Sequence, residues 1–283
     1  MTGKAQGRIS SQQARIWLVL CLGPNLSRNV LSEVGGYLGS PLLPCLRGQR
    51  LYLIDLETRK VSLYRLAVRF AHNCYYCLIS PLRLLCFPYD SSQVRALDLS
   101  NFAISPLPPM AIARFDPGAV VFDDCVYVFG GDWYKSNERY DHRLGKWANL
   151  APSHYCYFML SPCVYLTQIY LPQPELTEGQ MDVYAPLYGT FKLTPVPKLD
   201  LSRSVAFVDG ASLVWLTAQG DLVQQYLDAS QVQISRAAFE GNAVPGNSAP
   251  VCFGTFVYWT TPYGDQIYTF DIEKRAVDVL RLC

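Results

Sequence analysis

The hydrophobic residues of this chain fall in short runs that are separated by Gly, Pro, Asp, Asn and Ser. Clear examples are LRLLCF at 82–87, VYVF at 126–129, LVWLT at 213–217 and FVYWT at 256–260. Short runs bounded by turn residues predict β-strands, because a helix needs a longer segment with a 3.6-residue period. The pattern therefore predicts an all-β protein.

These runs recur with a period that an aspartate marks, each time after an apolar or aromatic residue. The marker set is Asp55, Asp98, Asp141, Asp228 and Asp271. The first three are 43 residues apart, and so are the last two. The gap of 87 residues between the third and the fourth leaves room for a copy near Ala185 that has lost its aspartate. The chain therefore contains six repeated units.

Each unit holds four apolar runs, and the position six residues after the marker is apolar in all six units. These positions are Val61, Ile104, Trp147, Phe191, Ile234 and Val277. A repeated four-stranded unit of this length predicts a β-propeller, in which neighbouring blades cover each other's faces. We expect a six-bladed propeller over residues 31–283, with four antiparallel strands in each blade.

The N-terminal part is open to two interpretations. We expect residues 1–30 to be an extension that is partly disordered or forms a short helix. The first two strands of the first blade are expected within residues 31–48, as EVGGYL and LLPCL. Alternatively, residues 24–38 form a short amphipathic helix with Asn25 or Ser27 as its N-cap.

The third unit contains the most complete motif, VYVFGGDWYKSNERYDHRLGKW at 126–147. The aspartate at the end of the third strand is expected to accept hydrogen bonds from the amides of the following turn. Gly130 and Gly131 are expected to take positive φ or to approach a neighbouring strand closely. Trp147 is expected to anchor the fourth strand inward, as are its aliphatic counterparts in the other units.

This stretch resembles the Kelch repeat family, whose pattern is four hydrophobic residues, a Gly pair, and a Tyr and a Trp with six residues between them, here Tyr140 and Trp147. LAP at 150–152 extends the likeness. The full motif is present only in the third unit, whereas the period covers about residues 50–283. The resemblance implies a Kelch-type propeller. It also implies that partners bind at the face formed by the second-to-third strand loops and the blade-to-blade connections.

That face supplies the candidate partner-binding residues, which are Trp133, Tyr134, Lys135, Arg114, Arg69, Arg203, His154, Tyr89 and Tyr263. Exposed aromatic residues among arginines have the chemistry of interaction hot spots, and arginines pair with carboxylates. The loop LPQPELTEGQ at 171–180 is longer than most others and is a further candidate for recognition. The alternative is that all of these are ordinary loop residues.

Charge and cysteine content narrow the function classes. There are 24 basic and 23 acidic residues, so the net charge of +1 leaves no electrostatic footprint for nucleic acid or an anionic membrane. Ten scattered cysteines suit a reducing compartment, and we expect a cytoplasmic protein. The run IWLVLCL at 16–22 keeps secretion as a minority alternative.

The sequence offers little for catalysis or metal binding. Cys74 and Cys77 in CYYC lie three residues apart, so on a strand they point to opposite faces and cannot chelate one ion. The three histidines are His72, His142 and His154, and no nucleophile elbow, phosphate loop or HExxH motif is present. We expect no cofactor and no metal.

The sequence thus predicts a non-catalytic protein-interaction module, acting as a scaffold or as a subunit of a larger assembly such as a cytoskeletal one. One alternative is a substrate-recognition subunit of a ubiquitin ligase, although the chain lacks a BTB domain and a full F-box. Another alternative is an enzyme built on the propeller, similar to a copper oxidase or a glycosidase.

Overall fold

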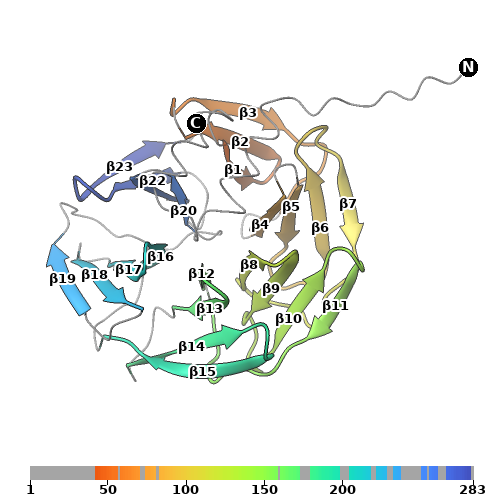
Figure 1. Ribbon diagram of the computed structural model, residues 1–283. Coiled ribbons are helices and arrows are strands. Elements are labelled where there is room, and N and C mark those ends of the chain that lie inside the picture. Colours follow the sequence, from red (N-terminus) through yellow and green to blue (C-terminus); the bar gives the residue numbers. More distant parts are fainter. Residues whose placement is uncertain are drawn as a thin grey trace, which may run out of the picture.

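The structure is a computed structural model that describes residues 42–56, 58–70, 74–80, 83–158, 160–172, 179–197, 204–217, 221–227, 232–236, 250–253, 255–260 and 266–281. In these ranges the chain forms 23 β-strands and no helix. The strands build six antiparallel sheets that stand around a common centre as the blades of a propeller (Figure 1). The predicted six-bladed, all-β propeller is therefore confirmed.

The first three blades come from the N-terminal half of the described chain. Blade 1 contains β1 (Leu42–Arg47), β2 (Arg50–Asp55) and β3 (Val61–Arg65). Blade 2 contains β4 (Tyr75–Ser80), β5 (Arg83–Phe87), β6 (Val94–Asp98) and β7 (Ile104–Leu107). Blade 3 contains β8 (Gly118–Phe122), β9 (Cys125–Phe129), β10 (Asn137–Asp141) and β11 (Lys146–Asn149).

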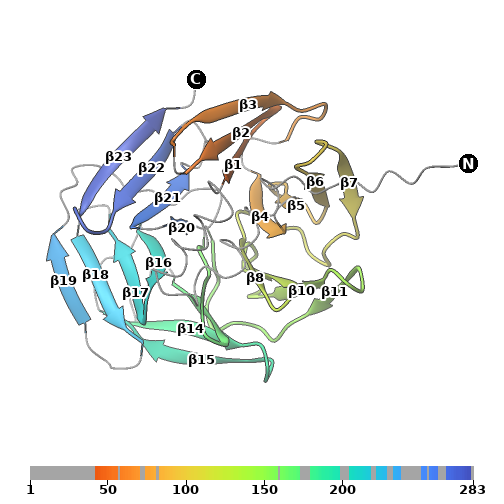
Figure 2. The same ribbon diagram turned by 45° about the horizontal axis from the view of Figure 1, so that its top comes forward.

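The other three blades complete the ring, which the tilted view in Figure 2 also shows. Blade 4 contains β12 (Cys163–Tyr165), β13 (Gln168–Leu171), β14 (Gln180–Ala185) and β15 (Thr190–Pro195). Blade 5 contains β16 (Val205–Asp209), β17 (Ser212–Leu216), β18 (Asp221–Tyr226) and β19 (Val232–Arg236). Blade 6 contains β20 (Val251–Phe253), β21 (Phe256–Thr260), β22 (Gln266–Asp271) and β23 (Ala276–Arg281).

Blade 1 differs from the prediction, because its sheet has three strands rather than four in the part of the chain that the structure describes. The predicted strand LLPCL is present as β1. The segment EVGGYL, the alternative helix over 24–38 and the extension 1–30 lie outside the described residues.

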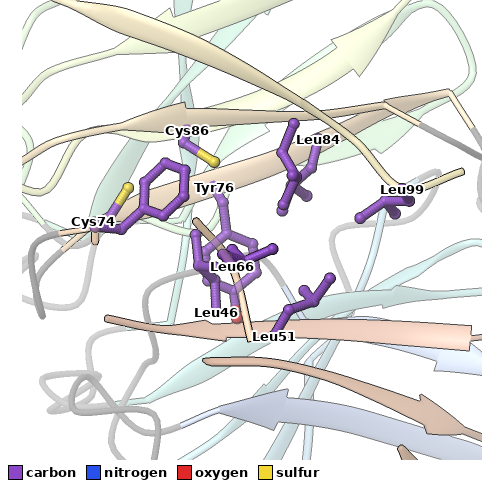
Figure 3. Close-up of a cluster of buried hydrophobic side chains, with 10 residues drawn as sticks. Leu46, Leu51, Leu66, Cys74, Tyr76, Leu84, Cys86 and Leu99 are labelled. Atoms are coloured by element: carbon purple, nitrogen blue, oxygen red, sulfur yellow. The ribbon is translucent and has the colours of Figure 1, made fainter. Parts of the chain in front are cut away.

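The blades are held together by six apolar clusters, one between each pair of neighbours. Figure 3 shows the cluster between blades 1 and 2, where Leu46 and Leu51 meet Tyr76 and Leu84. The ring closes where Tyr52 and Ile54 of blade 1 pack with Tyr258 and Ile267 of blade 6. A small isolated sheet leaves its apolar faces in water. In the ring each blade buries these faces against its neighbours, and this burial stabilises the fold.

The marker aspartates close the outer hairpins as predicted. Asp141 Oδ1 accepts hydrogen bonds from the amides of Arg143 and Leu144, each at 3.0 Å. Asp55, Asp98 and Asp271 bind the amides of their own turns in the same way. Asp228 lies outside the described residues. The marker is therefore a turn residue that recurs because the hairpin geometry of each blade requires it.

The prediction of an inward anchor six residues later is correct for Trp147 and wrong for two of its counterparts. The Trp147 ring packs on Tyr140, with 5.0 Å between the centroids, and its Nε1 donates to the carbonyl of Pro108 at 2.8 Å. Val61 is 39% exposed and Ile234 is 55% exposed. Ile104 and Val277 are aliphatic as well and pack against the clusters between blades, so side-chain size alone does not decide which of these positions points inward.

Candidate functional site

The two faces of the propeller differ in what forms them. Successive strands of a blade are antiparallel, so the hairpin turns between first and second strands and between third and fourth strands lie on one face. The second-to-third strand loops and the blade-to-blade connections lie on the opposite face, here called the loop face. The loop of residues 130–136, between β9 and β10, lies on this face.

The Gly pair that opens this loop is required by close backbone contacts. Gly130 has φ of +64°, and a Cβ at this position would lie 2.5 Å from both Cβ and O of Tyr157. Gly131 has φ of +73°, and its Cβ would lie 2.9 Å from the carbonyl oxygen of Phe115. The amide of Gly131 donates to Tyr157 O at 2.7 Å, and its carbonyl accepts from the amide of Phe115 at 2.7 Å. The predicted role of the pair is therefore correct, and the pair joins the connections on both sides of blade 3.

Arg114 is the main correction to the predicted site. It was expected at the exposed face, but it is fully buried. Its guanidinium donates to the carbonyl oxygens of Gly130 at 2.5 Å and Ser136 at 2.9 Å, and it forms an ion pair with Glu138 at 2.7 Å. The spacing of the sequence put Arg114 in a blade-to-blade connection but did not reveal the buried carboxylates that draw its side chain inward.

Buried polar groups also fix the loop from below. Asp132 is 3% exposed, and its Oδ1 accepts hydrogen bonds from the amides of Tyr134 at 3.3 Å and Ser136 at 3.2 Å. The hydroxyl of Ser136 donates to the other carboxylate oxygen of Asp132. The Asn137 side chain donates to the carbonyl oxygen of Lys135 at 3.1 Å and accepts from the amide of Gly130 at 3.2 Å. The loop backbone is therefore held at both ends and in its middle.

The two aromatic side chains of this rigid loop point away from the interior. Trp133 is 74% exposed and Tyr134 is 80% exposed. The Trp133 ring packs against Phe158, with 4.8 Å between the centroids. In the neighbouring loop of blade 2, Tyr89 is 44% exposed and meets the edge of Phe115 at 5.3 Å. We call these five residues the aromatic ledge; it extends over the loops of blades 2 and 3 and the connection to blade 4.

Two cationic or basic side chains border the aromatic ledge. The Nζ of Lys135 donates to the carbonyl oxygen of His154 at 2.6 Å. The amide of His154 donates to Asp182 at 2.9 Å, and its ring nitrogen Nδ1 also contacts that carboxylate. Asp182 is fully buried and accepts a further bond from the Tyr157 hydroxyl at 2.5 Å. Burial and the neighbouring Asp182 carboxylate raise the pKa of Tyr157 well above its usual value, so this hydroxyl stays a donor.

The structure thus brings together five of the nine predicted binding residues, namely Tyr89, Trp133, Tyr134, Lys135 and His154. Arg69 is exposed in the connection after β3. Arg203 and Tyr263 lie outside the described residues, as does most of the loop 171–180. Sequence reasoning missed Phe115 and Phe158, because an aromatic residue in an irregular connection carries no periodic signal.

Three acidic residues around the loop of blade 3 are withdrawn from the surface, which sequence reasoning also missed, whereas Asp90 beside Tyr89 is exposed and Asp116 beside Phe115 is half-buried. Asp132, Glu138 and Asp182 are each at most 3% exposed and are satisfied by Arg114, His154 and backbone amides. What faces outward at the loop of blade 3 is therefore aromatic, cationic or neutral.

The remaining candidate chemistry is structural. Cys74 packs between blades 1 and 2, whereas Cys77 packs against the cluster between blades 2 and 3. The two side chains point to opposite faces of the blade, as expected, and burial raises the pKa of Cys77 to about 12. Over the described ranges, no group of three or more His, Cys, Asp or Glu side chains could hold a metal ion. Nor does any helix in those ranges have the length and hydropathy of a membrane span.

Comparison with known proteins agrees with this geometry. Residues 113–153 match the family described as the Kelch motif. They include the Gly pair, the buried Arg114 and the whole loop of blade 3, set in a ring of six sheets. The chain is a six-bladed β-propeller that carries a Kelch motif in its third blade.

Two further comparisons concern the whole Kelch propeller. It is similar to a chain in the crystal structure of a nidogen/laminin complex, with a TM-score of 0.64 and 11% sequence identity. The match covers 86% of this chain and 94% of that chain, so the ring architecture is shared over nearly its full length. At this identity the likeness shows the fold alone. No curated protein matches the sequence.

Proposed function

We propose that this Kelch propeller is a non-catalytic protein-interaction module that binds its partner through the aromatic ledge. The observation that carries the proposal is the exposure of Trp133 and Tyr134, at 74% and 80%, on a backbone that is fixed by buried hydrogen bonds. A group of exposed aromatic side chains marks a surface that a partner can cover, whereas single exposed apolar residues are ordinary.

The rigidity of the loop supports binding as much as its exposure does. Ordering a mobile side chain or loop on association costs free energy, about 0.5–1.5 kcal/mol for each immobilised side chain. Here the network of Arg114, Asp132 and Ser136 orders the loop before a partner arrives. Binding through Trp133 and Tyr134 therefore carries no free-energy cost for ordering the loop backbone.

Two narrower functions, scaffold and ubiquitin-ligase subunit, differ in whether the chain needs a second contact besides the aromatic ledge. As a scaffold or a subunit of a larger assembly, it would hold one partner at the aromatic ledge. As a substrate-recognition subunit of a ubiquitin ligase, it would also need a ligase contact elsewhere on its surface. We favour the scaffold and a cytoplasmic location, the latter because ten cysteines are scattered through apolar runs.

The test replaces Trp133 and Tyr134 together by alanine and compares the complexes recovered from cells after chemical cross-linking. The hairpin turn of β14 and β15 offers a matched control, because Leu187 and Tyr188 are 81% and 76% exposed on the other face. We expect loss of the cross-linked partner for the first double variant and its retention for the Leu187→Ala/Tyr188→Ala variant. Equal recovery with both variants would contradict the proposal.

A further inference from the structure

The outermost strand of blade 1 has an open edge with a defined set of outward amides. β3 pairs with β2 alone in the described part of the chain. The amide of Asp55 donates to Lys60 O at 2.9 Å, and the amide of Leu66 donates to Gln49 O at 2.7 Å. Hydrogen-bonding residues alternate along an antiparallel strand, so these two bonds fix the phase of the ladder. The backbone groups of Ser62 and Tyr64 therefore face β2, and those of Val61, Leu63 and Arg65 face outward.

The side chains of β3 are unusually apolar for an edge. All five of its residues are exposed, with Val61 at 39%, Leu63 at 54% and Tyr64 at 37%. Two other outermost strands contain a proline that removes an amide from the edge, Pro106 in β7 and Pro195 in β15. β3 has no proline, as is also true of β11, β19 and β23, so its edge can accept another strand.

The segment around β3 is strongly basic. Residues 59–70 hold Arg59, Lys60, Arg65 and Arg69 and no acidic residue, in a chain whose net charge is +1. Arg65 lies directly opposite Arg50 in the ladder, and like charges opposite each other destabilise a sheet. Arg59 already contacts Asp278 of blade 6 at 3.4 Å. Anionic groups placed beside Lys60 would relieve this local excess of positive charge.

We propose that β3 is a second docking site, independent of the aromatic ledge, that binds an extended acidic segment of a partner protein as an added strand. The segment pairs with the outward backbone groups of Val61, Leu63 and Arg65. Its aliphatic side chains lie beside Val61 and Leu63, which register opposite Ile54 and Tyr52. Its carboxylates lie on the opposite face of the added strand, beside Lys60, because side chains alternate along a strand; Arg65, on the face of Val61 and Leu63, adds only to the overall positive charge of the edge.

Charge argues against two other occupants, and hydrogen bonding argues against a third. The first 41 residues of this chain carry four basic residues and one acidic residue, so they would be repelled by β3. A second copy paired through the same edge would bring Lys60 and Arg65 close to their own counterparts. A nucleic acid would satisfy the positive charge but would leave the outward amides and the exposed Val61 and Leu63 without matching groups.

The test measures binding of a labelled peptide of alternating Val and Glu, with blocked ends, to the full chain at low ionic strength. Leu63→Pro removes an outward amide and no hydrogen bond to β2, so we expect a folded variant with binding weakened by about tenfold or more. Leu63→Thr keeps the amide and should bind like the parent. In hydrogen exchange, the peptide should protect the amides of Val61, Leu63 and Arg65.

A charge series gives an independent readout. We expect Lys60→Glu to weaken binding of the acidic peptide, whereas Lys192→Glu, at an exposed position on the outermost strand of blade 4, should leave it unchanged. A peptide of alternating Val and Lys should not bind. Three outcomes would each overturn the proposal. The Val-Lys peptide could bind as well as the acidic peptide, or the Leu63→Pro variant could fail to fold. Alternatively, oligothymidylate could displace the acidic peptide and still bind to Leu63→Pro. Retained peptide binding by Trp133→Ala/Tyr134→Ala separates this site from the aromatic ledge.

Discussion

Blades 1 and 3 use the same strand spacing but very different amounts of the Kelch motif. Blade 3 has the Gly pair, the Tyr140–Trp147 contact and the buried charges of Arg114, Asp132 and Glu138. Blade 1 has none of these, yet its strands pair in register and pack on both neighbouring blades. The comparison indicates that apolar spacing is sufficient for a blade, whereas the motif residues position a loop.

The same division is visible along blade 3 itself. Its apolar residues, such as Val126 and Val128, face the neighbouring blade as those of every other blade do. The motif residues Gly130 and Gly131 lie where the chain leaves β9 for the loop face. Replacements in the two blades should therefore have effects of different size and different kind.

The largest effect is expected for Arg114→Leu. It leaves Glu138 and Asp132 buried without their counter-charge, which costs about 3–5 kcal/mol in the free energy of unfolding. The exposed pair of Arg143 and Asp124 is the matched control, and Arg143→Leu should cost at most about 1 kcal/mol. Urea unfolding measures both. Similar costs for the two variants would contradict the buried network.

The next largest effect is expected for Gly130→Ala. The added Cβ meets the Tyr157 backbone at 2.5 Å and the residue keeps φ of +64°, so we expect the clash to cost about 1–3 kcal/mol beyond the backbone strain. Gly145 has almost the same φ, +65°, and open space around its Cα. Gly145→Ala should therefore show the strain alone, about 1–2 kcal/mol. Thermal unfolding of both variants separates contact from conformation.

The fold could be predicted from the sequence because it depends on features that repeat. The spacing of apolar runs and the marker aspartates gave six blades, and Asp55, Asp98 and Asp141 close their turns as expected. The candidate site was predicted only in part. Trp133 and Tyr134 are exposed as expected, but the burial of Arg114 depends on carboxylates that are 18 and 24 residues further along the chain.

A smaller effect is expected where blade 1 meets blade 6. The hydroxyl of Tyr258 donates to the carbonyl oxygen of Leu56 at 3.1 Å across the closure of the ring. Tyr258→Phe should lower the free energy of unfolding by about 1 kcal/mol, because a buried carbonyl loses its donor. In Tyr268→Phe the lost bond is to Gln266 in the same strand, so the closure is not touched. Faster exchange of the β1 amides in the first variant alone would localise the effect to the closure.

The smallest effect on stability is expected for the residues that we propose to bind a partner. Trp133→Ala/Tyr134→Ala removes two exposed side chains and keeps every backbone contact of Gly130, Asp132 and Ser136, so the free energy of unfolding should change by less than about 1 kcal/mol. The same variant should lose the cross-linked partner. Arg114→Leu would lose it as well, but together with stability. A large loss of stability in the double alanine variant would mean that the aromatic ledge, like Trp147, belongs to the architecture of blade 3.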